Sequence, residues 1–303
     1  MRFRFGFGRR LIVLIPALAA GAVLVAAWPA FAADDAAPAK IAVLIVDGQN
    51  NHKWQETTPA IKEMLEKTGR FTVDVATTPP KKAAKEAWDK FRPDFAKYGA
   101  VLMNYNGDNW PEEVRKSFEK YMADGGGLVF YHAGVFAFPD WKEFNDMMGM
   151  GWRKPNQGMR LTIDADGKEV RTPSGGGPGS GHGPAHPFAI DVRDPKHPVM
   201  EGLPAKFMHV KDELYHGMRG PLTGMHILAT ALSDKTTGGT GTNEPMVWTV
   251  PFGKGRVFVS LLGHDVAATT APSSAVLLSR GLEWAATGKV TPSVPKELAG
   301  ETK

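Results

Sequence analysis

The chain has 303 residues, of which 43% are hydrophobic and 22% are charged, and it contains no cysteine. This composition excludes a disordered chain and a collagen-like repeat, and the length suffices for one large domain or two small ones. Without cysteine there is no thiol nucleophile, no thiolate metal ligand and no disulfide. The fold must therefore be held together by its core.

The formal net charge of +4 is concentrated at the N-terminus. Residues 1–32 contain four of the 36 basic residues and no acidic residue, which leaves 32 basic against 32 acidic residues in the rest of the chain. Beyond residue 32 the protein is formally neutral. The charge therefore gives no reason to expect a nucleic-acid partner, and an uncharged small molecule is the better expectation.

Residues 1–32 have the three parts of a signal peptide, namely a basic start, an apolar run at 11–28 and the small-x-small site Ala30-Phe31-Ala32. An uncleaved membrane anchor is the alternative, because such a run could just span a bilayer. The moderate apolarity of the run and the Ala-x-Ala site favour cleavage. We therefore predict export to the periplasm or the outside, with membrane contact only during export and with the Sec and twin-arginine routes both open.

The remainder divides into a linker at 33–39, one α/β domain at 40–290 and a polar tail at 291–303. The first half of the domain alternates strands with helices. In chain order these are a strand at 40–46, a helix at 57–68, a strand at 71–76, a helical stretch at 82–91, a strand at 100–105, a helix from Pro111 to Ala123, a strand at 128–131 and a helix at 141–148. This alternation predicts a doubly wound, mostly parallel sheet that binds its ligands at the carboxyl ends of the strands.

The second half predicts additional strands. Residues 172–187 are too rich in glycine and proline for regular structure, and are expected to form a long surface loop or lid. Strand patterns follow at 188–192, 226–232, 246–250 and 256–262, and a final helix is expected at 273–286.

Histidines follow three of the predicted strands. His52 lies in the loop after 40–46, and His264 closes the strand at 256–262. His132 stands at a sharp turn after 128–131, where a nucleophile elbow would carry its serine or cysteine. Because the carboxyl ends of parallel strands share one crevice, we expect these side chains to lie close together.

A fourth polar segment, Asp212–His216, offers carboxylates and a histidine. If it is helical, Glu213 and His216 share a face, and if it is extended, Glu213 and Tyr215 do. Imidazoles together with a carboxylate suit Zn²⁺ or a similar divalent cation, and they suit general acid–base catalysis without metal equally well. The candidate catalytic residues, which are also the candidate metal ligands, are His132, Glu213 and His264.

Other polar and aromatic side chains near the strand ends are candidates for contact with a sugar ring. The candidate substrate-binding residues are His52, Trp54, Tyr105, Trp110, Tyr215 and Asp265. His182 is expected to be solvated unless the glycine-rich loop closes over a ligand. His209 and His226 are expected to be structural.

The chain lacks a G-x-S-x-G elbow, a P-loop and a G-x-G-x-x-G turn after its first strand. The motifs of serine hydrolases, nucleotide hydrolases and dinucleotide oxidoreductases are therefore missing.

Several segments resemble the ThuA-like (trehalose-utilisation) family. They follow one another in the expected order between about residues 40 and 290, at 40–46 with the His52 loop, 125–133, 197–204, 212–215, 253–258 and 262–265. The resemblance implies a class I glutamine amidotransferase-like, flavodoxin-related α/β fold. In amidotransferases of that fold the elbow carries a catalytic cysteine. Because His132 takes that place here, the chain is not expected to be a cysteine-dependent glutamine amidotransferase.

The family's pattern carries onto His132, Glu213, Tyr215 and His264, and with a weaker match onto His52. The resemblance implies a role in disaccharide and keto-sugar utilisation. Together with the predicted signal peptide and the four polar segments, it leads us to expect an exported protein that acts on a disaccharide, a glycoside or a 3-keto-glycoside by acid–base or metal-assisted chemistry. Two alternatives remain open. One is a non-catalytic sugar- or partner-binding module on the same scaffold, and the other is a metal-dependent hydrolase of a non-sugar substrate.

Overall fold

The computed structural model describes residues 39–298. The predicted signal peptide, residues 33–38 of the linker and the last five residues of the predicted tail lie outside the described residues. Within 39–298, no helix combines the length and the apolar character needed to cross a membrane.

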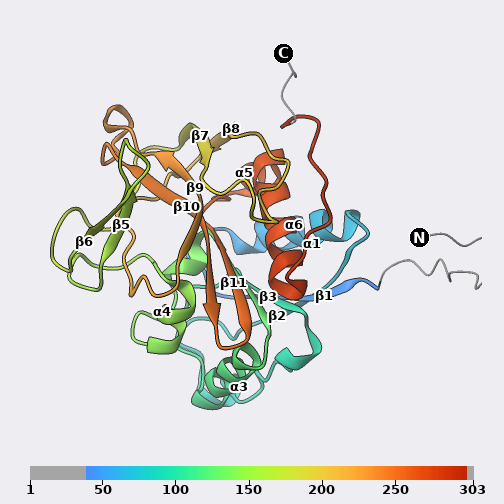
Figure 1. Cartoon of the computed structure of the whole chain (residues 1–303). Helices are drawn as coiled ribbons and strands as arrows, with labels where there is room; N and C mark the ends of the chain where they lie inside the picture. The colour runs from blue at the N-terminus through green and yellow to red at the C-terminus, as the bar shows by residue number, and fades with distance from the viewer. Residues whose placement is uncertain (1–38, 299–303) are drawn as a thin grey trace, which may run out of the picture. The chain divides into compact units, whose positions relative to one another are not determined.

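Five strands form the parallel half of an 11-stranded sheet, in the order β2-β1-β3-β4-β11 (Figure 1). This is the 2-1-3-4-5 order of flavodoxin-like sheets, and every neighbouring pair in it is parallel. The predicted doubly wound sheet is confirmed. The strands are β1 (Ile41–Asp47), β2 (Phe71–Thr77), β3 (Ala100–Met103), β4 (Gly127–Tyr131) and β11 (Gly255–Ser260).

The central strands are buried on both faces because helices cover both sides of the sheet. All residues of β3 and β4 are buried, as their continuous apolar runs predict. In Figure 1, α6 crosses the parallel strands on the side that also carries α1 and α5, and α3 and α4 lie on the other side. The helices are α1 (Trp54–Lys67), α3 (Glu112–Ala123), α4 (Lys142–Met148), α5 (Val266–Thr270) and α6 (Pro272–Thr287).

Beyond β11 the sheet continues as antiparallel strands in the order β10-β9-β7-β8, and the β5-β6 hairpin pairs with β10. The strands predicted in the second half are confirmed as β7 (His186–Val192), β9 (His226–Leu232), β10 (Asn243–Phe252) and β11. The sequence pattern missed the hairpin of β5 (Arg160–Ile163) and β6 (Glu169–Thr172), whose strands have only four residues each. It also did not predict β8 (Lys206–Asp212), which ends at the start of the segment 212–216 that the pattern left open between helical and extended backbone.

Two helix predictions need correction, and one short helix was not predicted. The stretch at 82–91 forms only one turn, α2 (Lys85–Trp88), and a short 3-10 turn follows at η1 (Phe95–Lys97), because Pro93 disfavours helical backbone in the residue before it. Pro111 is extended and precedes α3 as its N-cap residue instead of opening the first turn. The short helix α5 was not expected. It begins where the Asp265 side chain accepts a hydrogen bond from the backbone amide of Ala268.

Candidate functional site

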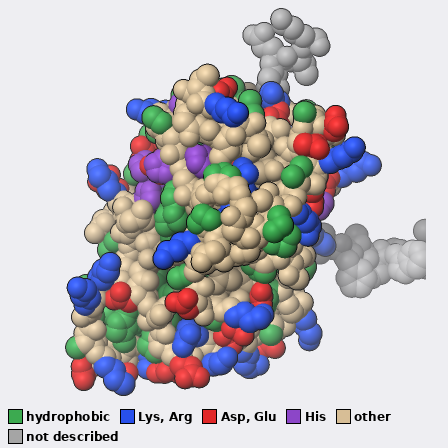
Figure 2. All heavy atoms as spheres, turned by 90° about the vertical axis from the view of Figure 1, so that its left-hand side faces the viewer, with side chains coloured by type: hydrophobic (Ala, Val, Ile, Leu, Met, Phe, Trp, Pro, Cys, Tyr) green, Lys and Arg blue, Asp and Glu red, His purple; other side chains and the backbone are tan. Residues whose placement is uncertain are grey.

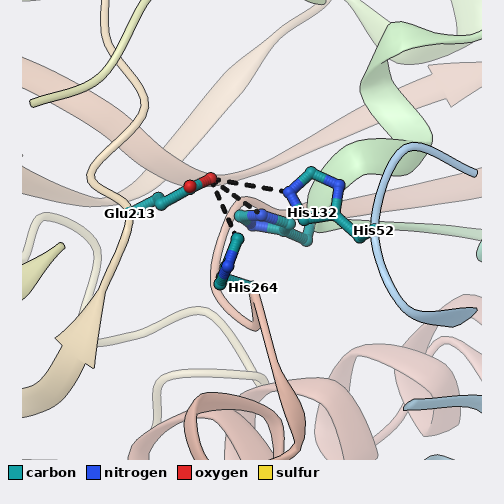
Figure 3. A group of neighbouring side chains, drawn as sticks. All are labelled: His52, His132, Glu213 and His264. Carbon is teal, nitrogen blue, oxygen red and sulfur yellow. Dashed lines mark ion pairs between the residues drawn. The ribbon is translucent and has the colours of Figure 1, made fainter. Parts of the chain in front are cut away.

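Four side chains from distant parts of the sequence meet beside the carboxyl ends of the parallel strands (Figure 3). His52 follows β1, His132 follows β4, His264 follows β11 and Glu213 comes directly after β8. Their potential ligand atoms all lie within 4.8 Å of one another, so the group could hold a metal ion. The ring centroids of His132 and His264 are 5.7 Å apart, close enough for one small-molecule site.

Glu213 is the centre of this group, as the dashed lines of Figure 3 show. Its Oε2 lies 3.1 Å from Nδ1 of His264, 3.5 Å from Nε2 of His52 and 3.6 Å from Nε2 of His132. Burial by itself would raise the pKa of Glu213, but its contacts with His132 and His52 and the charge of His264 outweigh burial and hold the pKa well below its usual range. Glu213 therefore presents a carboxylate to the three imidazoles.

The turn at His132 is built as a tight elbow. The backbone φ of His132 is +40°, in the left-handed region that is uncommon for residues other than glycine, and the 3-10 turn η2 (His132–Phe136) starts there. Gly134 packs so closely against β3 that a Cβ atom would lie 2.4 Å from the carbonyl oxygen of Met103. The strained turn directs the His132 ring toward Glu213.

Hydrogen bonds orient two of the imidazole rings through their outer nitrogens, the ring nitrogens that point away from Glu213. Nδ1 of His132 lies 2.7 Å from the carbonyl oxygen of Leu261, which can only accept, so Nδ1 donates here and Nε2 faces Glu213. Nδ1 of His52 lies 3.1 Å from Oδ1 of Asn51, which likewise turns its Nε2 inward. Partners of this kind commonly fix the tautomer of metal-binding histidines.

Glu213 and Tyr215 share the site, as the extended alternative for 212–216 predicts. The Tyr215 hydroxyl lies 2.6 Å from Nε2 of His132, and it donates to this nitrogen whenever the nitrogen carries no proton. Burial and the neighbouring charges of Glu213 and Asp212 raise the pKa of Tyr215 well above its usual value, so it keeps its proton. His216 points elsewhere, with Nδ1 3.2 Å from Oγ of Ser233.

The role of Asp212 is not visible in the sequence pattern. Its fully buried carboxylate accepts hydrogen bonds from the backbone amides of Glu213, Gly263 and His264 at 2.7 to 3.1 Å. It also lies 2.7 Å from Nε2 of His209, whose Nδ1 contacts Ser273 at 2.7 Å. Asp212 stands in a recognised polar segment, but nothing in the sequence placed it beside residues 263–264.

A cavity of about 680 Å³ opens beside the four residues. Of the predicted site residues, His52, Glu213, Tyr215, His264 and Asp265 line it, and His132 lies buried beneath. Figure 2 shows histidine side chains gathered on one part of the molecular surface. Several lining side chains were not among the predicted site residues, and Phe136, Trp152 and His182 are three of them.

Three predicted substrate-binding aromatics do not line this cavity. Tyr105 and Trp110 are 0% and 2% exposed and pack against Phe138 in the core. Because they are buried in the core, Tyr105 and Trp110 cannot make the expected contact with substrate. A residue near a strand end can turn its ring under the sheet, as these two do. Trp54 begins α1 and lines two smaller cavities.

The glycine-rich segment brings His182 to the site. Nε2 of His182 lies 3.6 Å from Oε1 of Glu213, the oxygen that is not directed at the other three histidines. The segment is anchored by Arg219, which is fully buried and donates to the carbonyl oxygens of Gly176 and Pro178, and by pairing between Gly181 and His216. A segment expected to be a surface loop or lid therefore forms part of the cavity wall.

Comparison with known families matches residues 42–285 of this chain to ThuA, described as trehalose utilisation. The chain belongs to the ThuA family. A ThuA-like protein from Parabacteroides merdae is 44% identical in sequence, with a TM-score of 0.82 over 88% of this chain and 96% of that one. A ThuA-like protein from Bacteroides uniformis shares the fold at 19% identity, with a TM-score of 0.57 over 84% of this chain and 96% of that one. The curated proteins contain no match.

Proposed function

We propose that this ThuA family member binds a divalent cation such as Zn²⁺ through His52, His132, His264 and Glu213, and acts with it on a carbohydrate. One observation carries the proposal: four ligand atoms of suitable type, from four separate segments, lie within 4.8 Å of one another. That span is close to twice a zinc–ligand bond of about 2.0–2.2 Å. His52, predicted as a substrate contact, becomes a fourth ligand in this proposal.

The donor set fits the cation in two further respects. The outer nitrogens of His52 and His132 are hydrogen-bonded, which leaves each Nε2 with a lone pair toward the common centre. Nδ1 of His264 is buried and, among the described residues, has no aligned hydrogen-bond partner, although Glu213 lies 3.1 Å away. A cation at the centre would satisfy this nitrogen.

The residues around the cluster support acid–base chemistry on a sugar. A bound cation would polarise a carbonyl or hydroxyl oxygen of the substrate. Tyr215 holds a proton at its hydroxyl beside His132, and Oε1 of Glu213 faces His182 at the cavity. These groups could donate and accept protons within one substrate-sized space.

The substrate class we propose is a disaccharide, a glycoside or a 3-keto-glycoside. The family is described by trehalose utilisation, and the chain is formally neutral beyond residue 32. The cavity volume falls within the roughly 300–1,000 Å³ of small-molecule sites.

We further propose that the protein is exported and that residues 1–32 are removed. The proposal rests on the basic, apolar and small-x-small pattern of those residues. Mass spectrometry of the protein from a fractionated cell tests it. A mature N-terminus at Ala33 in the periplasmic or extracellular fraction is the expected result, and an intact N-terminus in the cytoplasm would contradict export.

Metal binding is tested first with the metal alone. Metal-free protein is titrated with Zn²⁺ and Mn²⁺ by calorimetry, and H132A, H264A and E213Q are compared with H226A as the control. His226 pairs with Asp194 outside the cluster, so H226A is expected to keep the wild-type affinity. One equivalent of cation that is lost in the first three variants supports the site.

Turnover is then assayed on trehalose, maltose, cellobiose and their 3-keto derivatives, before and after chelation. We expect the chelator to abolish product formation and the added cation to restore it. A wild-type protein that binds no cation, together with turnover that is insensitive to the chelator, would disprove the metal site and leave acid–base chemistry by the same residues.

A further inference from the structure

One wall of the cavity is aromatic. Phe136 ends η2, Trp152 follows α4, and their rings stack with centroids 4.5 Å apart and planes inclined by 16°. Both side chains are half-buried and line the cavity. Tyr215 meets the Trp152 ring edge-on at a centroid distance of 5.1 Å, so this wall is continuous with the residues around His132.

A buried arginine holds the two rings in place. Arg153 is 5% exposed, and its guanidinium donates to the carbonyl oxygens of Phe136 at 3.2 Å, Ala137 at 2.7 Å and Trp152 at 2.9 Å. The backbone amide of Trp152 donates to Val135 at 3.1 Å. These bonds tie the backbones of both ring-bearing residues together. The aromatic surface is therefore ordered before a ligand arrives, which lowers the entropic cost of binding.

The charged side chains on the rest of the wall already have partners. Lys53 is the only lysine or arginine among the lining residues, and its Nζ lies 3.2 Å from Glu56. Asp265 accepts a hydrogen bond from the backbone amide of Ala268 at 2.8 Å. Among the described residues of the wall, no lysine or arginine is thus left without an acidic partner for a phosphorylated or carboxylated ligand. Aromatic surface combined with polar side chains suits a neutral, polyhydroxylated ring, whose C–H face packs on the aromatic rings while its hydroxyls meet the polar groups.

We propose that the stacked pair of Phe136 and Trp152 forms a platform, and that the reacting pyranose ring of a neutral saccharide packs on the ring face that the pair leaves open to the cavity. The centroid of Phe136 lies 6.5 Å from that of His52, so a ring on this platform would have one edge at the His/Glu cluster. The ring that stacks is therefore the one that presents its oxygens to the cluster. This assignment of the substrate subsite rests on the proposed function.

The test measures saccharide binding and Zn²⁺ binding separately on the full mature protein. The variants W152A, F136A and W152F are compared with W284A, since Trp284 is a half-buried tryptophan of α6 that packs on His197 and does not line the cavity. The probes are trehalose and cellobiose in the presence of Zn²⁺. Their binding is measured by saturation-transfer NMR and by calorimetry. Thermal unfolding of each variant shows whether it is folded.

We expect W152A and F136A to bind the saccharides at least about fivefold more weakly, because an aromatic stacking contact typically contributes that much. W152F should recover part of the affinity, W284A should match the wild type, and Zn²⁺ affinity should be the same in all four variants. If W152A and F136A bind saccharide as tightly as W284A does, the platform is wrong. If the wild type binds Zn²⁺ but neither saccharide, the ligand class is wrong.

Failure of the proposed function would look different. A wild-type protein that binds saccharide in a Trp152-dependent manner but takes up no Zn²⁺ or Mn²⁺ would disprove the cation site and leave the platform standing.

Discussion

The buried carboxylate of Asp212 accepts a hydrogen bond from the backbone amide of His264 over 3.1 Å. The same carboxylate accepts from the amide of the adjacent Glu213 at 2.8 Å, so one side chain positions two members of the cluster. His209 lies 2.7 Å from its other oxygen and is in contact with Ser273 at the start of α6. The site is thereby tied to the helix that covers the sheet.

Replacement of Asp212 by asparagine is expected to weaken cation binding by roughly 10- to 100-fold without abolishing it, the usual effect of losing a partner that orients metal ligands. Asparagine keeps the shape but offers an N–H group where an acceptor is needed. Calorimetry with Zn²⁺ measures the change, and circular dichroism checks the fold. S273A is the control, since it alters only the far end of the chain of contacts. Wild-type affinity in D212N would refute the positioning role.

The stability contributed by Asp212 should depend on pH in a defined window. Burial by itself raises the pKa of Asp212, but the hydrogen bond from His209 and the charges of His132 and His209 outweigh it and bring the pKa below the ordinary 3.8. A carboxyl group whose pKa is lower in the folded than in the unfolded state stabilises the fold above the unfolded value, and loses that effect as pH falls through the folded value.

The difference in unfolding free energy between metal-free wild type and D212N should therefore be on the order of 2 kcal/mol or more at about pH 5 to 6. It should shrink only below about pH 4. Urea unfolding at a series of pH values measures it. A difference that grows as the pH falls would contradict the sign of the shift.

The hydroxyl of Tyr215 and a cation at the cluster would compete for the same lone pair on His132. Removal of the hydroxyl in Y215F should therefore tighten Zn²⁺ binding by up to about fivefold, the equivalent of one hydrogen bond. Turnover should fall, because the proton donor beside the cluster is lost. Parallel measurement of Zn²⁺ affinity and kcat tests this. Weaker Zn²⁺ binding in Y215F would mean that the hydroxyl supports the cation instead of competing with it.

Glu213→Gln retains the size of the side chain and removes its charge. Turnover is expected to fall by about 10² or more, because the side chain can no longer accept a proton and is a poorer ligand. Steady-state kinetics on a substrate identified for the wild type provides the measurement, with E56Q as the comparison at an exposed carboxylate of the cavity wall. A loss of less than about tenfold would argue against a catalytic role for Glu213.

The sequence by itself determined the parallel sheet and the approach of the three histidines. Continuous apolar runs such as those of β3 and β4 are typical of strands covered on both faces, and both strands are fully buried. Side chains at the carboxyl ends of parallel strands must face one edge of the sheet, and this rule placed His52, His132 and His264 together. Local pattern was sufficient here because strand direction follows from chain connectivity.

Only the tertiary structure decided which other side chains build the cavity. Tyr105 and Trp110 turn into the core, whereas Phe136 and Trp152 line the wall, and no short-range pattern separates these pairs. Asp212 acquires its role through amides more than fifty residues away along the chain. The direction in which a side chain points after a strand ends is set by long-range packing and hydrogen bonding, and these contacts exist only in the folded chain.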